Sequence, residues 1–349
     1  MRRSWDKPHV RIETHGTPYA CGRQQGEAVR DLALVWIERR LDELQQRYQA
    51  ASRQALLEQI RPQIGTWRQA EEALYPQATA ECSGIAAGLG LDEESYFALT
   101  FYHRLGSHLP QCTIVGTRDA AGRPLVGKTD DIGRDELGMN ILETTRPTCG
   151  YAHRHFHFAG TLWTVAGINE CGLCIGMTGI PGPLRDKGLF SLTALHSILP
   201  ACANISQAIA HIRALQLNAY GFSLMLADAQ GNLTLIEKTS AGMRVLDPEH
   251  TQFAHTNHIL DAEFAQQNPA QHQSIDTNGQ RRLATAHALL AAGISPHQIL
   301  ANRDPQGPIC QHGEDDLHTD FAVVFSPMEK TLDLWPGYPD EVAKETLTL

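Results

Sequence analysis

A cysteine at position 112 is the residue of this chain best placed to act as a nucleophile. Cys112 opens a polar, β-branched run, residues 112–116, and follows Leu109-Pro110. Proline lacks an N–H group and disfavours helix in the residue before it, so we expect an extended chain from Cys112 onward. A second strand at 124–129 leads directly into Asp130 and Asp131. A hairpin of these two strands would bring a thiol, a cation and a carboxylate together, although only one of two adjacent aspartates can face Cys112.

The Cys112 thiol needs a helper, because the thiolate is the nucleophile and an ordinary cysteine has a pKa of about 8.5. A histidine or a lysine could assist, but none of the 17 histidines is singled out by its spacing from Cys112. A second route is cleavage of the bond between Gln111 and Cys112 by an N-to-S acyl shift in a strained turn. The new α-amino group, with a reference pKa of about 7.7–8.0, would then lie beside the thiol as its base.

Two further groups of residues could bind a metal ion. His153, His155 and His157 alternate and therefore share one face of a strand. We interpret this face as hydrated or facing a partner. A second group, Cys310, His312, Asp315, Asp316 and His318, fits no zinc spacing and is interpreted as a loop. Cys171 and Cys174 lie in strand-like sequence. We expect both to be buried thiols rather than a redox or zinc motif.

Composition excludes several classes of protein. The 349 residues carry a net charge of −10 and no long basic run, which argues against a nucleic-acid partner. No stretch approaches the roughly 18 apolar residues of a membrane span, and the two early arginines are followed by no apolar signal-peptide region. The eight cysteines are too sparse for a disulfide scaffold, so we expect reduced thiols and a cytoplasmic location.

The order of predicted elements favours an α+β protein. Residues 23–108 have helical spacing of apolar residues, and strand patterns dominate after Cys112. We expect strands at 113–117, 124–129, 140–144, 151–158, 161–166, 172–178, 221–228, 232–238, 242–246, 252–255, 320–326 and 331–335. Helices fit 189–199, 204–215 and 279–292, and 262–280 is the stretch most typical of a loop. Helices first and sheets afterwards indicate layers rather than alternating βαβ units.

Several blocks, in this order and spacing, resemble a known family. They are residues 16–26, residues 81–88, the dipeptide Cys112-Thr113, residues 127–131, residues 167–173, residues 226–231 with Ile236-Glu237, and residues 255–258. Together they resemble the self-processing acyl-coenzyme A:6-aminopenicillanic acid acyltransferase-like family, peptidase family C45, of the N-terminal-nucleophile hydrolase superfamily. The resemblance runs over nearly the whole chain. It implies a four-layer αββα sandwich with a helical N-terminal segment.

The resemblance also implies roles for individual residues. Cys112 would be the nucleophile of self-cleavage and of catalysis, Asp131 would orient the new α-amino group, and Asn257 would donate to the oxyanion. An arginine at 281 or 282 completes such sites, and we place Arg281 in the catalytic set and Arg282 with Lys128 and Thr113 among the substrate contacts. Three positions depart from the family pattern: Gln111 stands where glycine is common, Lys128 where Arg or Gln is found, and Thr129 where Asn is found.

The expected protein is therefore a precursor that cuts itself into chains 1–111 and 112–349, which stay associated as one globular unit. The mature enzyme would take an acyl group from an amide or thioester onto Cys112 and pass it to water or an amine, without a cofactor or a metal ion. Two alternatives stay open. One is a cysteine hydrolase that works uncleaved with a His or Lys helper. The other is a non-catalytic metal-binding protein built on His153–His157 and the 310–320 stretch.

Overall fold

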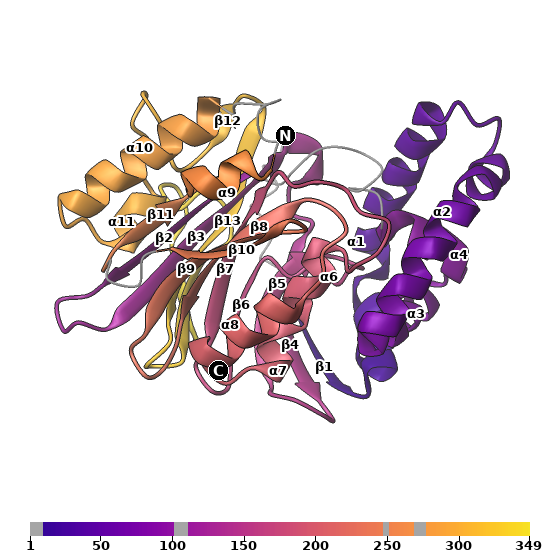
Figure 1. The fold of residues 1–349 in the computed structure, drawn as a ribbon, viewed down its shortest axis with the longest axis horizontal. Coiled ribbons are helices and arrows are strands. Elements are labelled where there is room, and N and C mark those ends of the chain that lie inside the picture. The colour runs from indigo at the N-terminus through magenta and orange to yellow at the C-terminus, as the bar shows by residue number, and fades with distance from the viewer. Residues whose placement is uncertain (1–9, 101–110, 247–250, 269–276) are drawn as a thin grey trace.

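Two stacked β-sheets with helices on both outer faces form the structure (Figure 1). The computed structural model describes residues 10–100, 111–246, 251–268 and 277–349. Sheet I has eight strands and sheet II has seven. Strands β2 and β3 of sheet II lie against β7 and β8 of sheet I, so the two sheets pack face to face. The expected αββα order of layers is confirmed.

Sheet I contains one strand from before Cys112 and seven strands from after it. Its order is β1 (Arg11–Gly16), β4 (Asn140–Pro147), β5 (His153–Phe158), β6 (Ala166–Asn169), β7 (Cys174–Ile180), β8 (Gly221–Ala227), β9 (Leu233–Thr239) and β10 (Gly242–Leu246). The pair β1–β4 is parallel and the other pairs are antiparallel. Residues 1–111 thus contribute an edge strand to a sheet otherwise built from residues after Cys112.

Sheet II carries the candidate nucleophile. Its order is β11 (Phe253–His255), β2 (Gln111–Arg118), β3 (Pro124–Gly133), β13 (Leu317–Ser326), β14 (Thr331–Trp335) and β15 (Glu345–Thr348), and β12 (His312–Glu314) pairs with β13. Helices α10 (Thr277–Ala291) and α11 (Pro296–Leu300) cover its outer face. Their apolar residues pack on Val115, Ala322 and Val324, while Ile114, Phe321 and Val323 point into the layer between the sheets.

Helices cover the outer face of sheet I as well. The first four are α1 (Pro18–Arg47), α2 (Arg53–Leu74), α3 (Pro76–Leu89) and α4 (Glu93–Thr100), and three short ones follow: α6 (Ser191–His196), α7 (Ile198–Ala201) and α8 (Ile205–Ala214). The other helical segments within the described residues are the 3-10 turn η2 (Arg134–Glu136) and α9 (Ala262–Gln266). In the described part of the chain, none of the helices combines the length and apolar character needed to cross a bilayer.

Glycines allow α1 and α3 to touch along their backbones. A Cβ atom added at Gly22 would lie 2.1 Å from the carbonyl oxygen of Glu81, and one at Gly84 would lie 2.2 Å from that of Tyr19. Real Cβ atoms never approach backbone so closely, so the two helices can meet in this way only where side chains are absent. The glycine-containing blocks at 16–26 and 81–88 are therefore the two halves of one helix contact.

The structure departs from the predicted elements in three places. Strand β1 precedes the predicted helical segment and was not expected, because only Thr14 of this charged edge strand is buried and the apolar alternation of a strand is absent. The strand predicted at 161–166 is wrong, because Leu162 and Trp163 are buried without pairing in the sheet. The stretch 262–280 contains α9 and the start of α10, and residues 269–276 lie outside the described residues. The prediction of helix at 101–108 also falls outside them.

Candidate active site

The hairpin of β2 and β3 positions Cys112. The two strands are antiparallel, with Gln111 paired to Asp131, Cys112 to Asp130 and Thr113 to Thr129. Alternation along the strands directs Cys112, Lys128 and Asp130 into the layer between the sheets. Thr113, Thr129 and Asp131 point the other way, toward α10. The site therefore has two sides that meet at the backbone of Cys112.

On the side between the sheets, the thiol of Cys112 lies in a buried polar group. Lys128 Nζ donates to Cys112 Sγ at 3.1 Å and to Asp130 Oδ1 at 2.7 Å. The thiol in turn donates to the same carboxylate oxygen at 3.5 Å. All three side chains are buried. The predicted meeting of thiol, cation and carboxylate at the hairpin is observed, and Asp130 is the aspartate that faces the sulfur.

A bulge in β13 brings a second carboxylate to this side. The register between β3 and β13 shifts between Thr319 and Phe321, which leaves Asp320 unpaired. Bulges re-aim side chains next to functional sites, and here Asp320 turns toward Asn140. The Asn140 amide donates to Asp130 Oδ2 and to Asp320 Oδ2, at 2.9 Å each. Sequence reasoning missed both Asn140 and Asp320.

On the side of α10, the buried guanidinium of Arg282 holds the start of β2. It donates to the carbonyl oxygen of Cys112 at 2.6 Å and to Thr113 Oγ1 at 2.9 Å. Its second amino group donates to Gln111 Oε1 at 3.0 Å and to Asn257 Oδ1 at 3.2 Å. Nε donates to Asn278 Oδ1 at 2.6 Å. These acceptors, with Asp131 at 3.9 Å, offset the cost of burying the charge.

The two neighbouring arginines differ in their placement. Arg281 is half exposed, and its guanidinium lies 3.3 Å from the exposed Asp315 carboxylate. Helix α10 buries Asn278, Arg282, Ala286 and Leu290, which recur every four residues. Residue 281 is rotated about 100° from 282 around the helix axis, which carries its side chain off this face. The structure brings Arg282, not Arg281, to Cys112.

Asn257 meets the backbone of the nucleophile. Its Oδ1 accepts from the Cys112 N–H at 3.0 Å, and its Nδ2 donates to the Gly179 carbonyl at 3.1 Å. The two donors around Oδ1, Cys112 N and Arg282, determine which end of the amide faces the strand. Nearby, Nε2 of the buried His255 lies 3.0 Å from Glu237 Oε1, and Glu237 also accepts from the Leu260 N–H. This buried pair fixes the turn that carries Asn257.

Asp131 lies among hydroxyl groups rather than at the Cys112 amide. Its carboxylate accepts from Thr319 Oγ1 at 2.6 Å and from Thr129 Oγ1 at 3.1 Å. The Thr129 hydroxyl itself accepts from the Thr113 N–H at 3.2 Å. In the uncleaved chain, Asp131 thus supports the strand next to the nucleophile through Thr129, and Asn257 holds the amide nitrogen.

The charges of the buried group follow from its pKa shifts. Burial raises the pKa of the Cys112 thiol to about 12, against the opposing effect of Lys128. Burial disfavours the ammonium of Lys128, but Asp130 and Cys112 outweigh it and raise its pKa. Burial also raises the pKa of Asp131 to about 6, although Arg282 and Thr319 oppose the shift. At neutral pH the uncleaved chain therefore holds a neutral thiol beside a charged ammonium.

The bond between Gln111 and Cys112 lies in regular strand. Both residues belong to β2 and have partners in β3. Neither has a positive φ angle, and the described residues contain no cis peptide bond. The strained turn expected at this bond is thus not present within 111–112. Residues 101–110, which precede it, lie outside the described part.

Among the described residues, neither candidate metal-binding group has a hydrogen bond to Cys112. His153, His155 and His157 are buried, so the prediction of a hydrated or partner-facing strand is wrong. Glu143, His155 and His157 have ligand atoms within 4.8 Å of one another, and so do Cys310, His312 and Asp340. Part of the predicted 310–320 loop forms β12 and β13. Cys174 is buried and Cys171 half-buried, and all eight cysteines are free thiols.

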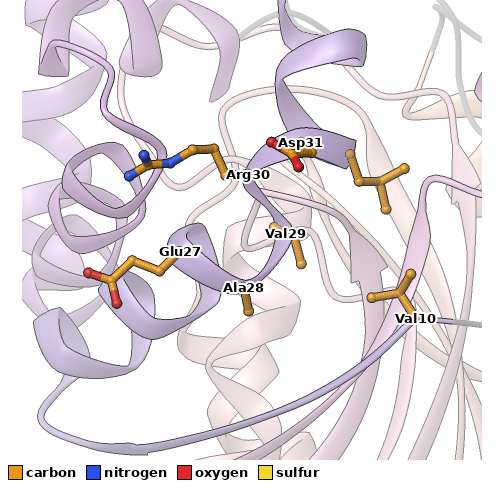
Figure 2. A pocket seen from close by; sticks show the side chains of 7 residues that line it. Val10, Glu27, Ala28, Val29, Arg30 and Asp31 are labelled. Atoms are coloured by element: carbon orange, nitrogen blue, oxygen red, sulfur yellow. The ribbon is translucent and has the colours of Figure 1, made fainter.

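A surface pocket lies beside α1 and does not include the nucleophile. It is lined by Val10 and residues 27–32, and Figure 2 shows the side chains of Glu27 and Arg30 directed away from Val10. Cys112 is completely buried. The pocket thus has no access to the thiol, and we assign the substrate no position in it.

Comparison with known proteins supplies a family. The family model described as "Acyl-coenzyme A:6-aminopenicillanic acid acyl-transferase" matches residues 118–341. The matched range covers β3 through β14 and begins after Cys112. A search of curated proteins finds no match.

Two solved structures illustrate the more distant likeness. A mutant of conjugated bile acid hydrolase from Clostridium perfringens is 12% identical, with 68% of this chain and 97% of that chain covered and a TM-score of 0.42. The N-acylethanolamine-hydrolyzing acid amidase (NAAA) ortholog of Caenorhabditis elegans is 14% identical, with 68% and 100% covered and a TM-score of 0.44. Neither likeness is close enough to carry an argument about the site.

Proposed function

The chain belongs to the acyl-coenzyme A:6-aminopenicillanic acid acyl-transferase family, and from this premise we propose that it is a self-processing enzyme whose nucleophile is Cys112. As a member of this family it hydrolyses amide bonds or transfers acyl groups. The observation that carries the proposal is the buried contact of Cys112 with Lys128, Asp130, Asn257 and Arg282. These side chains come from strand β3, the turn after β11 and helix α10, and they converge on one residue.

Self-cleavage would start from the chain as it stands. The thiol proton passes to Asp130, and Sγ attacks the carbonyl carbon of Gln111. The bond from that carbon to the Cys112 nitrogen breaks, the nitrogen takes up a proton, and a thioester forms. Water then releases Gln111 as a carboxylate and frees the Cys112 thiol. The hydrogen bond that the thiol donates to Asp130 and the ammonium of Lys128 beside the sulfur support this sequence.

The mature enzyme would use the new α-amino group as its base. Asn257 Oδ1 already accepts from this nitrogen and would keep the amine in position. The thiol proton passes to the amine, Sγ attacks an amide or thioester carbonyl, and the leaving group takes the proton. An acyl-Cys112 thioester remains, and water or an amine completes the reaction. Donation to the oxyanion by Asn257 Nδ2 stays a prediction, since this group donates to Gly179 in the uncleaved chain.

Burial of the thiol supports an order of events. Substrate cannot reach Cys112 in the uncleaved chain, because the residue has no exposed surface and its pKa is raised to about 12. Cleavage would free the start of β2 and supply the base at the same time. The proposed substrate is a small acyl amide or acyl thioester, and the proposed location is cytoplasmic, supported by the eight free thiols.

A second candidate is a cysteine hydrolase that works uncleaved. It is favoured by one observation, the contact of Lys128 Nζ with Cys112 Sγ at 3.1 Å, which would serve as the helper without an α-amino group. The two candidates predict different masses for the active protein. One consists of chains 1–111 and 112–349, and the other remains at 38.5 kDa.

Denaturing intact mass spectrometry of the wild-type protein and of Cys112→Ala tests the proposal. We expect two fragments in the wild type, the larger beginning at Cys112, and one full-length species in Cys112→Ala. Cleavage and turnover of acyl amides should both disappear in that variant. Cys202→Ala is the matched control, because this buried thiol directly follows α7, a helix on the outer face of sheet I. A cleaved and active Cys112→Ala protein would refute the proposal, and an active full-length wild type would favour the second candidate.

A further inference from the structure

A second buried group of polar side chains lies on the opposite face of sheet I from the catalytic site. Glu143 in β4 and His155 in β5 are paired in the sheet, and His157 follows two residues later. Phe156 between the two histidines stacks on Phe321 of sheet II, at 4.4 Å between ring centroids. The histidines therefore point outward, toward α1, while Phe156 fills the layer between the sheets. We call Glu143, His155 and His157 the Glu143 triad.

The triad has the composition and spacing of a metal site. One ligand atom from each side chain lies within 4.8 Å of the other two. His157 Nε2 lies 2.9 Å from Glu143 Oε2, and His155 Nε2 lies 3.9 Å from it. Two ligands that each lie about 2.1 Å from one zinc ion are separated by about 3.0–3.4 Å for angles between the right angle and the tetrahedral angle. The first separation is close to this range, and metal binding would require the second, now 3.9 Å, to shorten by about 0.5 Å.

Hydrogen bonds around His157 leave its Nε2 facing a carboxylate. Its Nδ1 lies 3.0 Å from the carbonyl oxygen of Phe158, so Nδ1 must carry a hydrogen. In the neutral ring, the lone pair of Nε2 then points at the Glu143 oxygen, which is repulsive unless a cation lies between them. A backbone carbonyl on the far ring nitrogen is also the arrangement that orients metal-binding histidines. The cation is either a second proton or a metal ion.

Hydrogen bonds from neighbouring side chains hold the other two ligands, Glu143 and His155, in position. Glu143 accepts from Thr14 Oγ1 and Thr145 Oγ1 on one oxygen and from Gln25 Nε2 on the other. His155 Nδ1 lies 2.9 Å from Thr164 Oγ1, and its Nε2 lies 3.4 Å from Thr145 Oγ1 and 3.9 Å from Glu143 Oε2. A metal ion would take the neutral form of this ring through Nε2.

Two buried polar atoms beside the triad are unsatisfied among the described residues. Gln25 Oε1 and His153 Nε2 have no hydrogen-bond partner there, although Gln25 contacts Glu143 and the His153 ring lies 5.1 Å from that of His155. His153 Nδ1 lies 2.9 Å from the Tyr151 carbonyl oxygen, so Nδ1 carries the hydrogen of the neutral ring. Its Nε2, like that of His157, then carries a lone pair. Buried polar atoms rarely stay unsatisfied, and an ion with a bound water would supply partners for such atoms.

We propose that Glu143, His155 and His157 bind one divalent transition-metal ion, with zinc as the first candidate. Two imidazoles and a carboxylate form a ligand set that suits zinc, with a water in the fourth position. The ion would link β4 to β5 at the place where Thr14 of β1 and Gln25 of α1 meet Glu143. The site lies across sheet I from Cys112, so the proposal is independent of the proposed reaction.

Metal content of the full-length protein tests the site. The protein is produced in medium supplemented with zinc, because buried ligands are most readily loaded during folding, and zinc is measured after gel filtration. Production with cobalt adds a visible absorption band that reports the ligand geometry. The variants His155→Gln and Glu143→Gln remove one ligand each. His312→Gln is the matched control, because it removes a ligand from the other group, Cys310, His312 and Asp340.

We expect about one zinc ion per chain in the wild type and in His312→Gln, and loss of this ion in both triad variants. Cobalt should bind the triad variants more than about 100-fold more weakly than the wild type, since even outer-shell changes cost 10–100-fold. Loss of zinc in His312→Gln but not in His155→Gln would overturn the proposal by assigning the ion to the other group. A folded wild type that retains neither metal would also overturn it and leave a proton between Glu143 and His157. The wild-type measurement decides even if a variant fails to fold.

Discussion

The paired arginines at 281 and 282 illustrate how far a sequence pattern determines a single residue. The family resemblance requires one arginine at this place, and both are present. The buried residues of α10 at 278, 282, 286 and 290 share a spacing of four. Ala286 and Leu290 could therefore have identified Arg282 as the residue on the buried face, had this spacing been applied to the choice.

We expect the two arginines to respond very differently to substitution. Arg282→Gln removes a buried charge with five acceptors and leaves Asp131 without its cation, a change that typically costs about 3–5 kcal/mol. Arg281→Gln removes a half-exposed ion pair, and its effect should stay within about 0.5 kcal/mol. Chemical denaturation measures both, and intact mass spectrometry should show cleavage lost in Arg282→Gln alone. Equal effects of the two variants would contradict this assignment.

Other residues of the site were beyond prediction for a physical reason. Asp130 and Asp131 are adjacent, and the strand register that turns Asp130 toward Cys112 depends on where the hairpin begins. Asp320 faces the site because β13 contains a bulge, and a bulge leaves no sure mark in a single sequence. Asn140 opens a strand of the other sheet, so only the packing of the sheets brings it near Asp130.

At the scale of elements, the strands with apolar alternation or turn signals were predictable and the short polar ones were not. The hairpin of β2 and β3 was expected from its pattern and is observed. Strands β1, β12 and β15 are partly exposed and carry charged residues, so the period that marks a strand is absent. They form because neighbouring strands offer hydrogen-bond partners, which is a tertiary effect.

The contact of α1 with α3 makes a sharp prediction at this scale. Gly84→Ala places a methyl group 2.2 Å from the Tyr19 carbonyl, so the helices must separate. Overpacking of this kind costs about 1–3 kcal/mol or more, against a gain in helix propensity of up to about 1 kcal/mol. We therefore expect a net loss of stability, measured as a lower midpoint of urea unfolding.

A second glycine in the same helical layer provides the control. Gly65 lies within α2, and a Cβ atom there would meet nothing within 4 Å. Gly65→Ala should therefore stabilise the protein by about 0.5–1 kcal/mol, because alanine favours helix and restricts the unfolded chain. A stabilising Gly84→Ala would mean that the α1–α3 contact tolerates a side chain and that the two glycine blocks have another role.

At the scale of the whole molecule, residues before and after the proposed cleavage point are interleaved. The parallel pairing of β1 with β4 joins them within sheet I. Buried polar contacts add to it: Gln25 with Glu143, Glu81 with His196, and Glu71 with the N–H of Phe190. Apolar residues of α1, such as Trp36, pack against Phe158 and Trp163. Cleavage of one peptide bond would remove none of these contacts.

We therefore expect the fragments 1–111 and 112–349 to remain together after cleavage. Processed protein should elute from a gel-filtration column in the same position as uncleaved Cys112→Ala, while a denaturing gel separates it into two bands. Denaturant should release the fragments only as the protein unfolds, because the shared sheet and helical core hold them. Loss of the smaller fragment in native buffer would show that sheet I is stable without β1, and that the contacts of Glu143 and His196 with residues 1–111 contribute little to cohesion.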